Sequence, residues 1–288
     1  MPHNNDSIRP PGPGSTSVYR GQTCAYVIES SSKPLIDSIY GLFLKYDRLD
    51  VDVDVDVDVG VDAAVAGQPG FTMTLNDVND VNDVNDDREK YAIHVSGTLN
   101  REKTRRSLVT CQTLADRMAD QTVATANDQI VKMLEMIQEQ MWALEGLNRL
   151  AVPYYGLDDI LVINGSFFCF FNDDKLFTID PDTHLMGVSR PIGRGHAFYA
   201  PELKGRLHAL PYTVDYRASL YSLGMLAAFC ALMNWDLVVN PAAAAKSWRT
   251  YSESELVSML DPIKYSKLYW FVLRCCRTDV KRRLCVFV

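Results

Sequence analysis

The first 99 residues combine two strand patterns with one helical pattern. Residues 18–29 are rich in β-branched and aromatic side chains and predict a strand that is broken at Gly21. Residues 34–49 place apolar side chains three and four positions apart, which predicts an amphipathic helix. A further short strand is expected at residues 91–95. This order indicates a mixed region of strands and one helix.

The rest of the chain is mainly helical around a group of short strands. Residues 108–120 and 128–150 carry helical stripes, and the second stripe is long and strongly apolar. Strands are expected at residues 160–163, 167–171 and 176–179. Asn172-Asp173-Asp174 would supply a tight turn between the last two of these strands. Helices are expected again after a loop rich in Gly and Pro, and residues 220–233, apolar on every side, predict a helix buried in the core.

Residues 50–87 differ from both regions in composition. Asp and Val alternate in the first part of this stretch, Asn-Asp-Val repeats in its last part, and it holds eleven Asp with no Lys, Arg or Glu. The formal net charge of -7 would become +4 without these eleven Asp. An EF-hand loop that began at Asp54 would have Val59 in place of the required Gly and Val65 in place of the required Glu. We therefore expect a solvated acidic insertion rather than a calcium site.

Composition also bears on where the protein works. Residues 1–17 are polar, rich in Pro and Gly, and lack the apolar run of a secretory signal, so we expect a disordered lead. No segment offers the run of about 18 uncharged apolar residues that a membrane helix needs. The seven Cys show no metal-ligand spacing, which favours reduced thiols and an intracellular protein of the cytoplasm or nucleus. The basic residues after Lys264 are expected to form a solvated surface, so a nucleic-acid partner is not expected.

Three segments of the second half resemble the protein-kinase family. Residues 197–203, AFYAPEL, resemble the end of the activation segment with its Y-x-A-P-E-L motif. Residues 220–224, LYSLG, resemble the start of the buried central helix. Residues 279–283, DVKRR, resemble the D-P-x-x-R run of the last helices. Three short motifs in the family order are more specific than any one of them alone.

The resemblance implies an α+β fold of two lobes. The small, β-rich lobe would comprise residues 18–99, with the acidic insertion inside it. The larger, mainly helical lobe would comprise residues 100–288. Within the large lobe, the resemblance implies structural roles for Pro201, Glu202, Gly224 and Arg283. Glu202 would form an ion pair with Arg283, or with Arg282 after a slip of one residue.

The nucleotide-binding features of the family are altered. Gly12 and Gly14 lie in a segment that resembles the glycine-rich loop, whose backbone N–H groups hold the ATP phosphates. Residues 25–29, AYVIE, occupy the place of the V-A-I-K strand without its Lys, so Lys33 is the nearest cation that could contact a phosphate. The resemblance implies ATP and magnesium as cofactors if nucleotide binding is retained at all.

The catalytic loop admits two alignments. In the first, Asp159-Ile160-Leu161 matches the family N-I-L, so that Asp159 replaces the metal-binding Asn and Tyr154 replaces the catalytic Asp. In the second, Asp159 is the catalytic Asp itself and Asn164 would bind magnesium. Asp180 fits the position of the magnesium-binding D-F-G Asp in both alignments. The second alignment keeps all three polar groups, but it replaces a polar loop with the apolar residues 160–163.

Three hypotheses follow from these losses. The first is a pseudokinase, a kinase shape that binds or regulates a protein partner such as a kinase or a kinase substrate. The second is a divergent active Ser/Thr kinase that uses Asp159, Asn164, Asp180 and Lys33. The third is an unrelated α+β interaction protein with a chance motif. The repeats and the divergence are typical of a fast-evolving genome, such as that of a large DNA virus.

Overall fold

The chain forms a mixed α+β protein with small antiparallel sheets. It divides into two units, Met1–Cys111 with Ile163–Phe167, and Gln112–Val162 with Phe168–Val288. The computed structural model describes residues 7–9, 16–19, 26–49, 71–77, 91–97, 109–119, 126–191, 197–203, 206, 209–238 and 251–286. No helix among these residues is long and apolar enough to cross a membrane.

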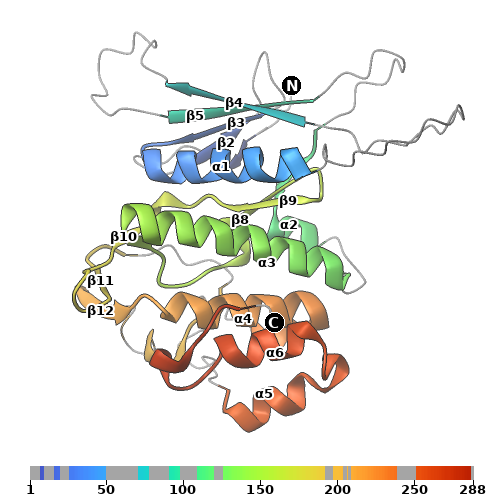
Figure 1. Cartoon of the computed structure of the whole chain (residues 1–288), viewed down its shortest axis with the longest axis vertical. Coiled ribbons are helices and arrows are strands. Elements are labelled where there is room, and N and C mark those ends of the chain that lie inside the picture. Colours follow the sequence, from blue (N-terminus) through green and yellow to red (C-terminus); the bar gives the residue numbers. More distant parts are fainter. Residues whose placement is uncertain are drawn as a thin grey trace, which may run out of the picture. The chain divides into compact units, whose positions relative to one another are not determined.

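The first unit contains a five-stranded antiparallel sheet in the order β1-β2-β3-β5-β4. Helix α1 lies along one face of this sheet (Figure 1). Its buried side chains Leu35, Ile36, Ile39 and Leu42 recur three and four positions apart, so the predicted amphipathic helix is confirmed. The elements of this unit are β1 Ser7–Arg9, β2 Ser17–Tyr19, β3 Tyr26–Ser30, α1 Lys33–Leu49, β4 Phe71–Asp77 and β5 Tyr91–Gly97.

Strand β4 corrects the prediction that residues 50–87 are wholly an insertion. It pairs with β5 over its full length, from Phe71 opposite Gly97 to Asp77 opposite Tyr91. Its sequence, FTMTLND, alternates apolar and polar residues and carries the β-branched Thr that strands favour. The Asp-Val alternation and most of the Asn-Asp-Val repeat lie outside the described residues.

The second unit is mainly helical, with α4 enclosed in its core. Every residue of α4 from Ala218 to Cys230 is buried, which confirms the prediction of a helix that is apolar on all sides. Gly224 allows a close approach between α4 and the end of α6, since a Cβ atom there would lie 2.7 Å from Cys275 Cβ and 2.8 Å from Cys276 Sγ. The helices are α2 Leu114–Ala119, α3 Asn127–Trp142, α4 Ala218–Leu232, α5 Glu253–Met259 and α6 Lys267–Cys275.

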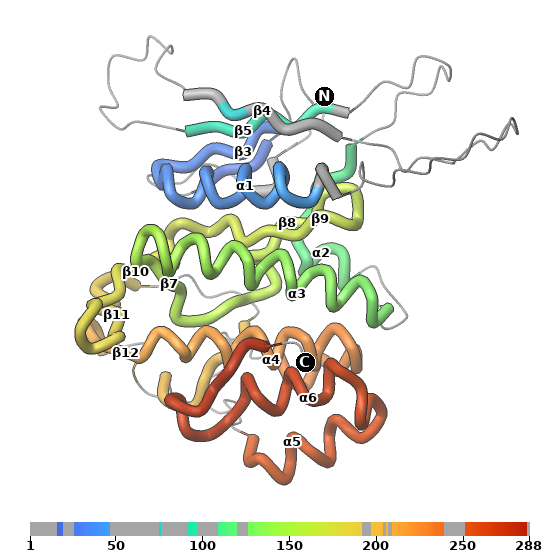
Figure 2. The backbone as a smooth tube through the Cα atoms, viewed as in Figure 1, coloured from blue at the N-terminus to red at the C-terminus, as the bar shows by residue number. Residues whose placement is uncertain are grey.

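Helix α3 ends differently from the prediction, which extended one helix to residue 150. A π-helical turn, Ala143–Leu147, follows α3 directly. The chain after α6 turns back along α4 and α6 toward the C-terminus (Figure 2), and Leu284 N donates to Arg274 O at 3.3 Å. Short 3₁₀ turns form at Leu157–Asp159, Asp173–Lys175, Pro201–Leu203, Trp235–Leu237, Asp261–Ile263 and Val280–Arg282.

Seven short strands form three small sheets, in the orders β6-β8-β9, β7-β10 and β11-β12. The prediction of a single helix over residues 108–120 was wrong in part, because this segment forms strand β6 followed by helix α2. The pair β11 and β12 lies where only loop was expected. The bounds are β6 Cys111–Thr113, β7 Leu150–Ala151, β8 Ile160–Ile163, β9 Phe167–Phe170, β10 Phe177–Thr178, β11 Leu185–Val188 and β12 Tyr212–Asp215.

The predicted turn at Asn172-Asp173-Asp174 forms as part of the 3₁₀ turn Asp173–Lys175, but it does not close a hairpin, because β9 pairs with β8 instead of β10. The β8–β9 turn is Asn164-Gly165, with φ of 49° and 70° and a hydrogen bond from Ser166 N to Ile163 O at 3.2 Å. Asn-Gly is the pair that such a two-residue hairpin favours, because both central residues need positive φ. The signal was therefore present in the sequence and was overlooked.

Candidate functional site

Glu202 and Arg283 form the ion pair that the kinase resemblance implies. Arg283 Nη1 lies 2.5 Å from Glu202 Oε1, and Arg283 Nη2 lies 2.9 Å from Glu202 Oε2. The two residues are 81 positions apart in the sequence. Two parallel hydrogen bonds match the planar fork of guanidinium to the two carboxylate oxygens. The predicted pairing is confirmed for Arg283, whereas the alternative partner, Arg282, is exposed.

The surroundings of Arg283 satisfy the rest of its guanidinium group. The residue is only 1% exposed. Its Nε donates to the backbone oxygen of Arg277 at 2.9 Å, and its Nη1 also lies 3.4 Å from the oxygen of Arg217. The guanidinium carbon lies 5.3 Å from the ring centre of Tyr221 on α4. These contacts supply the partners that a buried cation requires.

Pro201 and Gly224, the other two residues with predicted structural roles, also lie at specific positions. Pro201 begins the short 3₁₀ turn that carries Glu202, where its fixed φ suits the first helical residue. Gly224 occupies the tight contact between α4 and α6. The fixed φ of Pro201 and the small size of Gly224 therefore each suit the local structure.

Asp159 lies in a buried polar cluster with Lys175 and Asn172. Lys175 Nζ donates to Asp159 Oδ2 at 2.5 Å, and Asn172 Nδ2 donates to Asp159 Oδ1 at 2.7 Å. The backbone N–H of Gly156 donates to Oδ2 at 2.7 Å. The side chains of Asp159 and Lys175 are each 3% exposed. The carboxylate thus serves an internal network in which both oxygens are already engaged.

Tyr154, which the first alignment places at the catalytic Asp position, is buried beside the same cluster. Lys175 Nζ lies 4.2 Å from the centre of its ring, a cation–π distance. The ring also packs edge-on against Tyr199, with centroids 4.4 Å apart. Burial, followed by the nearby Tyr199 and Asp159, raises the pKa of Tyr154 above its ordinary value. A neutral phenol therefore occupies this position at physiological pH.

Asn164 and Asp180, the proposed magnesium ligands, each stabilise a turn. Asn164 Oδ1 accepts from the backbone N–H of Thr110 at 3.0 Å, and Asn164 is the first residue of the β8–β9 turn. Asp180 Oδ1 accepts from the N–H groups of Asp182 and Thr183 at 3.0 and 2.9 Å. These bonds, that of Thr183 above all, lower the pKa of the exposed Asp180 carboxyl.

Magnesium is usually held by one or two carboxylates together with substrate phosphates. Among the parts of the chain that the structure describes, no group of three or more His, Cys, Asp and Glu could hold a metal ion. Asp159 is bound to a lysine, and Asp180 holds its own loop. Asp159 would therefore have to give up its contact with Lys175 to bind magnesium.

The proposed nucleotide-contacting residues lie partly outside the described residues. Gly12 and Gly14 are among the residues that the structure leaves undescribed. Lys33 begins α1, and its Nζ contacts both carboxylate oxygens of Asp37 at 2.8 and 2.7 Å. On β3, Val27 is buried and Glu29 accepts a hydrogen bond from the hydroxyl of Tyr19. No lysine is therefore present on β3, in the place of the V-A-I-K strand.

Sequence reasoning missed Lys175 and Asn172 as partners of Asp159. The sequence predicts only a tight turn at Asn172, whose side chain is buried after five apolar residues, FFCFF. Lys175 stands alone between the polar turn and a strand, which gives no sequence signal for burial. Comparison with known proteins adds no relative, because no family model and no curated protein matches the chain.

Proposed function

We propose that this chain is a protein-kinase-like protein with impaired or absent phosphoryl transfer, which acts as a binding or regulatory scaffold for a protein partner. The observation that carries the proposal is the ion pair between Glu202 and Arg283. No local pattern links residues 81 positions apart. The kinase resemblance names these two residues as partners, so their contact supports the family assignment and the two-lobed arrangement that goes with it.

The packing of α4 gives independent support. The family motif at residues 220–224 predicts a helix enclosed by its lobe, and α4 is buried on all sides. The glycine of that motif, Gly224, lies against α6 at a distance that no larger residue would allow without movement. The burial of α4 and the close contact at Gly224 thus give physical reasons for the motif at residues 220–224 in this chain.

The polar groups argue for impaired chemistry. Phosphoryl transfer needs a lysine on the phosphates, a carboxylate facing the attacking hydroxyl, and two metal ligands. In this chain β3 lacks the lysine, Tyr154 replaces the carboxylate in the first alignment, and Asp159 is neutralised by Lys175. The second alignment, which makes Asp159 the catalytic group, would require the carboxylate to leave a buried ion pair.

A thermal-shift titration with ATP and magnesium, combined with a radiolabelled phosphate-transfer assay, tests the proposal. We expect a shift of less than about 1 °C at millimolar ATP, because little binding to the folded state means little stabilisation. We also expect no transfer to the chain itself or to a generic basic substrate. Magnesium-dependent transfer that is lost in Asp180→Ala, but kept in Asp182→Ala, would favour the active-kinase alternative.

The fold is tested separately from the activity. A crystal structure in which Glu202 and Arg283 are unpaired, or which lacks two lobes, would favour an unrelated interaction protein. Absent turnover together with an intact pair would support the scaffold. These two readouts distinguish failure of the family assignment from failure of the activity assignment.

A further inference from the structure

A cavity of about 470 Å³ lies at the end of helix α3, within the second unit. Its wall is formed by the π-helical turn after α3, by the loop between β10 and β11, and by Tyr216 after β12. This volume lies in the range of small-ligand sites. None of the residues assigned above to catalysis, metal binding or nucleotide binding lines the cavity.

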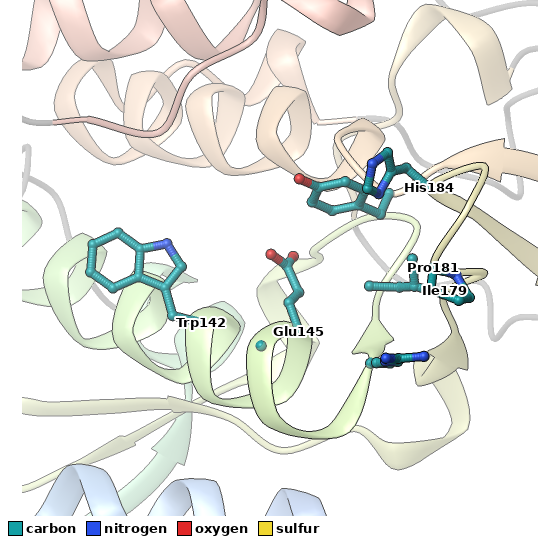
Figure 3. A pocket seen from close by; sticks show the side chains of 8 residues that line it. Trp142, Glu145, Ile179, Pro181 and His184 are labelled. Atoms are coloured by element: carbon teal, nitrogen blue, oxygen red, sulfur yellow. The ribbon is translucent and has the colours of Figure 1, made fainter.

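The π-helical turn places one carboxyl group inside this cavity. Figure 3 shows the Glu145 carboxylate between Trp142 on one side and Ile179, Pro181 and His184 on the other. Trp142 and Glu145 lie three positions apart, so they share one face of the helix end. π-helical turns of this kind occur frequently at functional sites.

Glu145 forms no ion pair with another described residue. None of the described side chains forms a hydrogen bond with its carboxylate either. Burial raises the pKa of Glu145 to about 7, because the surroundings replace water without supplying a partner for the charge. Glu145 is half-buried at the cavity, so a cation or a hydrogen-bond donor that entered there could contact its carboxylate.

The walls around this carboxyl are largely aromatic and apolar. Trp142 is 57% exposed, so its indole face is available to a ligand. Tyr216 lies across the cavity, and burial followed by the charge of Glu145 raises the pKa of its phenol. Aromatic faces attract ammonium and guanidinium groups, and most strongly where water is partly excluded.

We infer that this cavity is a binding site for a primary ammonium group carried on an apolar stem. The carboxylate of Glu145 would receive the ammonium group, and Trp142, Ile179 and Pro181 would pack against the stem. A free arylalkyl amine and the lysine side chain of a partner protein share this chemistry. Binding here does not depend on whether the chain is kinase-like.

Two basic side chains also line the cavity and would oppose a cation. Arg149 is exposed to solvent, where water and salt screen its charge, and it forms no ion pair with Glu145. His184 lies beside Tyr216, with ring centroids 6.2 Å apart. The ionisable groups that face Glu145 from the adjoining segments are thus Arg149, His184, Tyr216 and Tyr155.

The first experiment compares 2-phenylethylamine with its neutral analogue 2-phenylethanol. Binding is followed by nuclear magnetic resonance on the full chain, through the indole N–H signal assigned with Trp142→Phe. We expect the amine to bind at least about ten times more tightly than the alcohol at pH 8, consistent with a charge-assisted hydrogen bond. We expect Glu145→Gln to lose this preference. Equal binding of the two compounds, or a preference that survives in Glu145→Gln, would overturn the inference.

A second variant blocks the cavity without touching its charges. Gly146 lines the cavity, and a Cβ atom placed there would meet no atom within 4 Å, so Gly146→Leu should fold normally and fill the space. We expect this variant to bind neither compound. Gly41 on α1 is also helical, exposed and open, so Gly41→Leu is the matched control and should bind like the wild type. Wild-type binding by Gly146→Leu would contradict the site.

The pH dependence distinguishes Glu145 from His184. With a pKa of about 7 for Glu145, the ionised fraction rises about tenfold from pH 6 to pH 8, and amine affinity should rise with it. The rise should persist in His184→Gln and vanish in Glu145→Gln. A rise that vanishes in His184→Gln would assign the effect to histidine and overturn the role of Glu145.

A third experiment distinguishes a free amine from the lysine of a partner protein. Nα-acetyl-lysine amide is titrated in parallel with 2-phenylethylamine. Tighter binding of the lysine derivative indicates a partner's lysine, and weaker binding indicates a free amine.

Discussion

Lys175 lies between the carboxylate of Asp159, 2.5 Å from its Nζ, and the face of Tyr154, 4.2 Å away. All three side chains are buried. We predict that Lys175→Met destabilises the protein by about 3–5 kcal/mol, because it leaves a buried carboxylate without a counter-charge. Urea unfolding measures the change. The double variant Asp159→Asn, Lys175→Met should recover most of the loss, since it removes both charges together.

A loss below about 1 kcal/mol in Lys175→Met would mean that water or another cation reaches Asp159 easily. Asp159 would then be more accessible than its contacts indicate, and the active-kinase alternative would gain weight. Lys264→Met is the control, because Lys264 lies on the surface and its ion pair is with the exposed Asp261. It should change the unfolding free energy by less than about 0.5 kcal/mol.

The Glu202–Arg283 pair should matter for stability to a similar degree. Glu202→Gln leaves the buried Arg283 without its anion, and we expect a loss of about 3–5 kcal/mol in the free energy of unfolding. Arg282→Gln is a matched control one residue away, and its exposed side chain should contribute less than about 0.5 kcal/mol. Equal effects of the two variants would argue against a structural role for the pair.

Glu145 should make stability depend on pH. Its folded pKa of about 7 lies above its ordinary value of 4.5, so the folded state binds the proton more tightly than the unfolded state. The resulting stabilisation is complete below about pH 4.5 and is lost as pH rises through 7. At pH 8, Glu145→Gln should therefore exceed the wild type by about 1–3 kcal/mol in unfolding free energy. A wild-type advantage at pH 8 that disappears at pH 5 would reverse the sign and contradict the prediction.

A side chain at Gly224 should lower the stability of the protein. In Gly224→Ala the new Cβ would press against Cys275 and Cys276, and overpacking of this kind costs about 1–3 kcal/mol. Gly41→Ala is the opposite case, because its Cβ meets open space and alanine favours helices by about 1 kcal/mol. Thermal unfolding should therefore show a lower midpoint for the first variant and an equal or higher one for the second.

The elements that sequence predicted best are those with long apolar periodicity. The apolar stripe of α1 predicts a helix with one buried face, and the apolar residues all round α4 predict a helix buried on every side. In both cases one pattern predicts the helix and its burial together. The strands around residues 108–120 and 185–215 are only three or four residues long, and their pairing partners are distant in sequence. Such short strands are defined by their neighbours more than by their own residues.

The candidate site divides in the same way. The Glu202–Arg283 pair could be predicted because a family motif names both partners. The contact of Asp159 with Lys175 could not, because a single Asp and a single Lys sixteen positions apart carry no pattern. Glu145 was also missed, since its pKa depends on burial by segments far from it in the chain. Local sequence does not record such desolvation.

The π turn at Ala143–Leu147 gives the chain a point at which one residue changes the geometry. A π turn holds more residues per turn than an α-helix, so deleting a single residue there would let α3 continue as a regular helix. Each residue of an α-helix advances the direction of its side chain by about 100°. Because a π turn closes with one residue more than an α turn, the deletion would leave the side chains on either side of the turn in nearly the same direction and would shift those within it, including Glu145. The loss of a single codon would therefore remove the turn that carries Glu145 into the cavity.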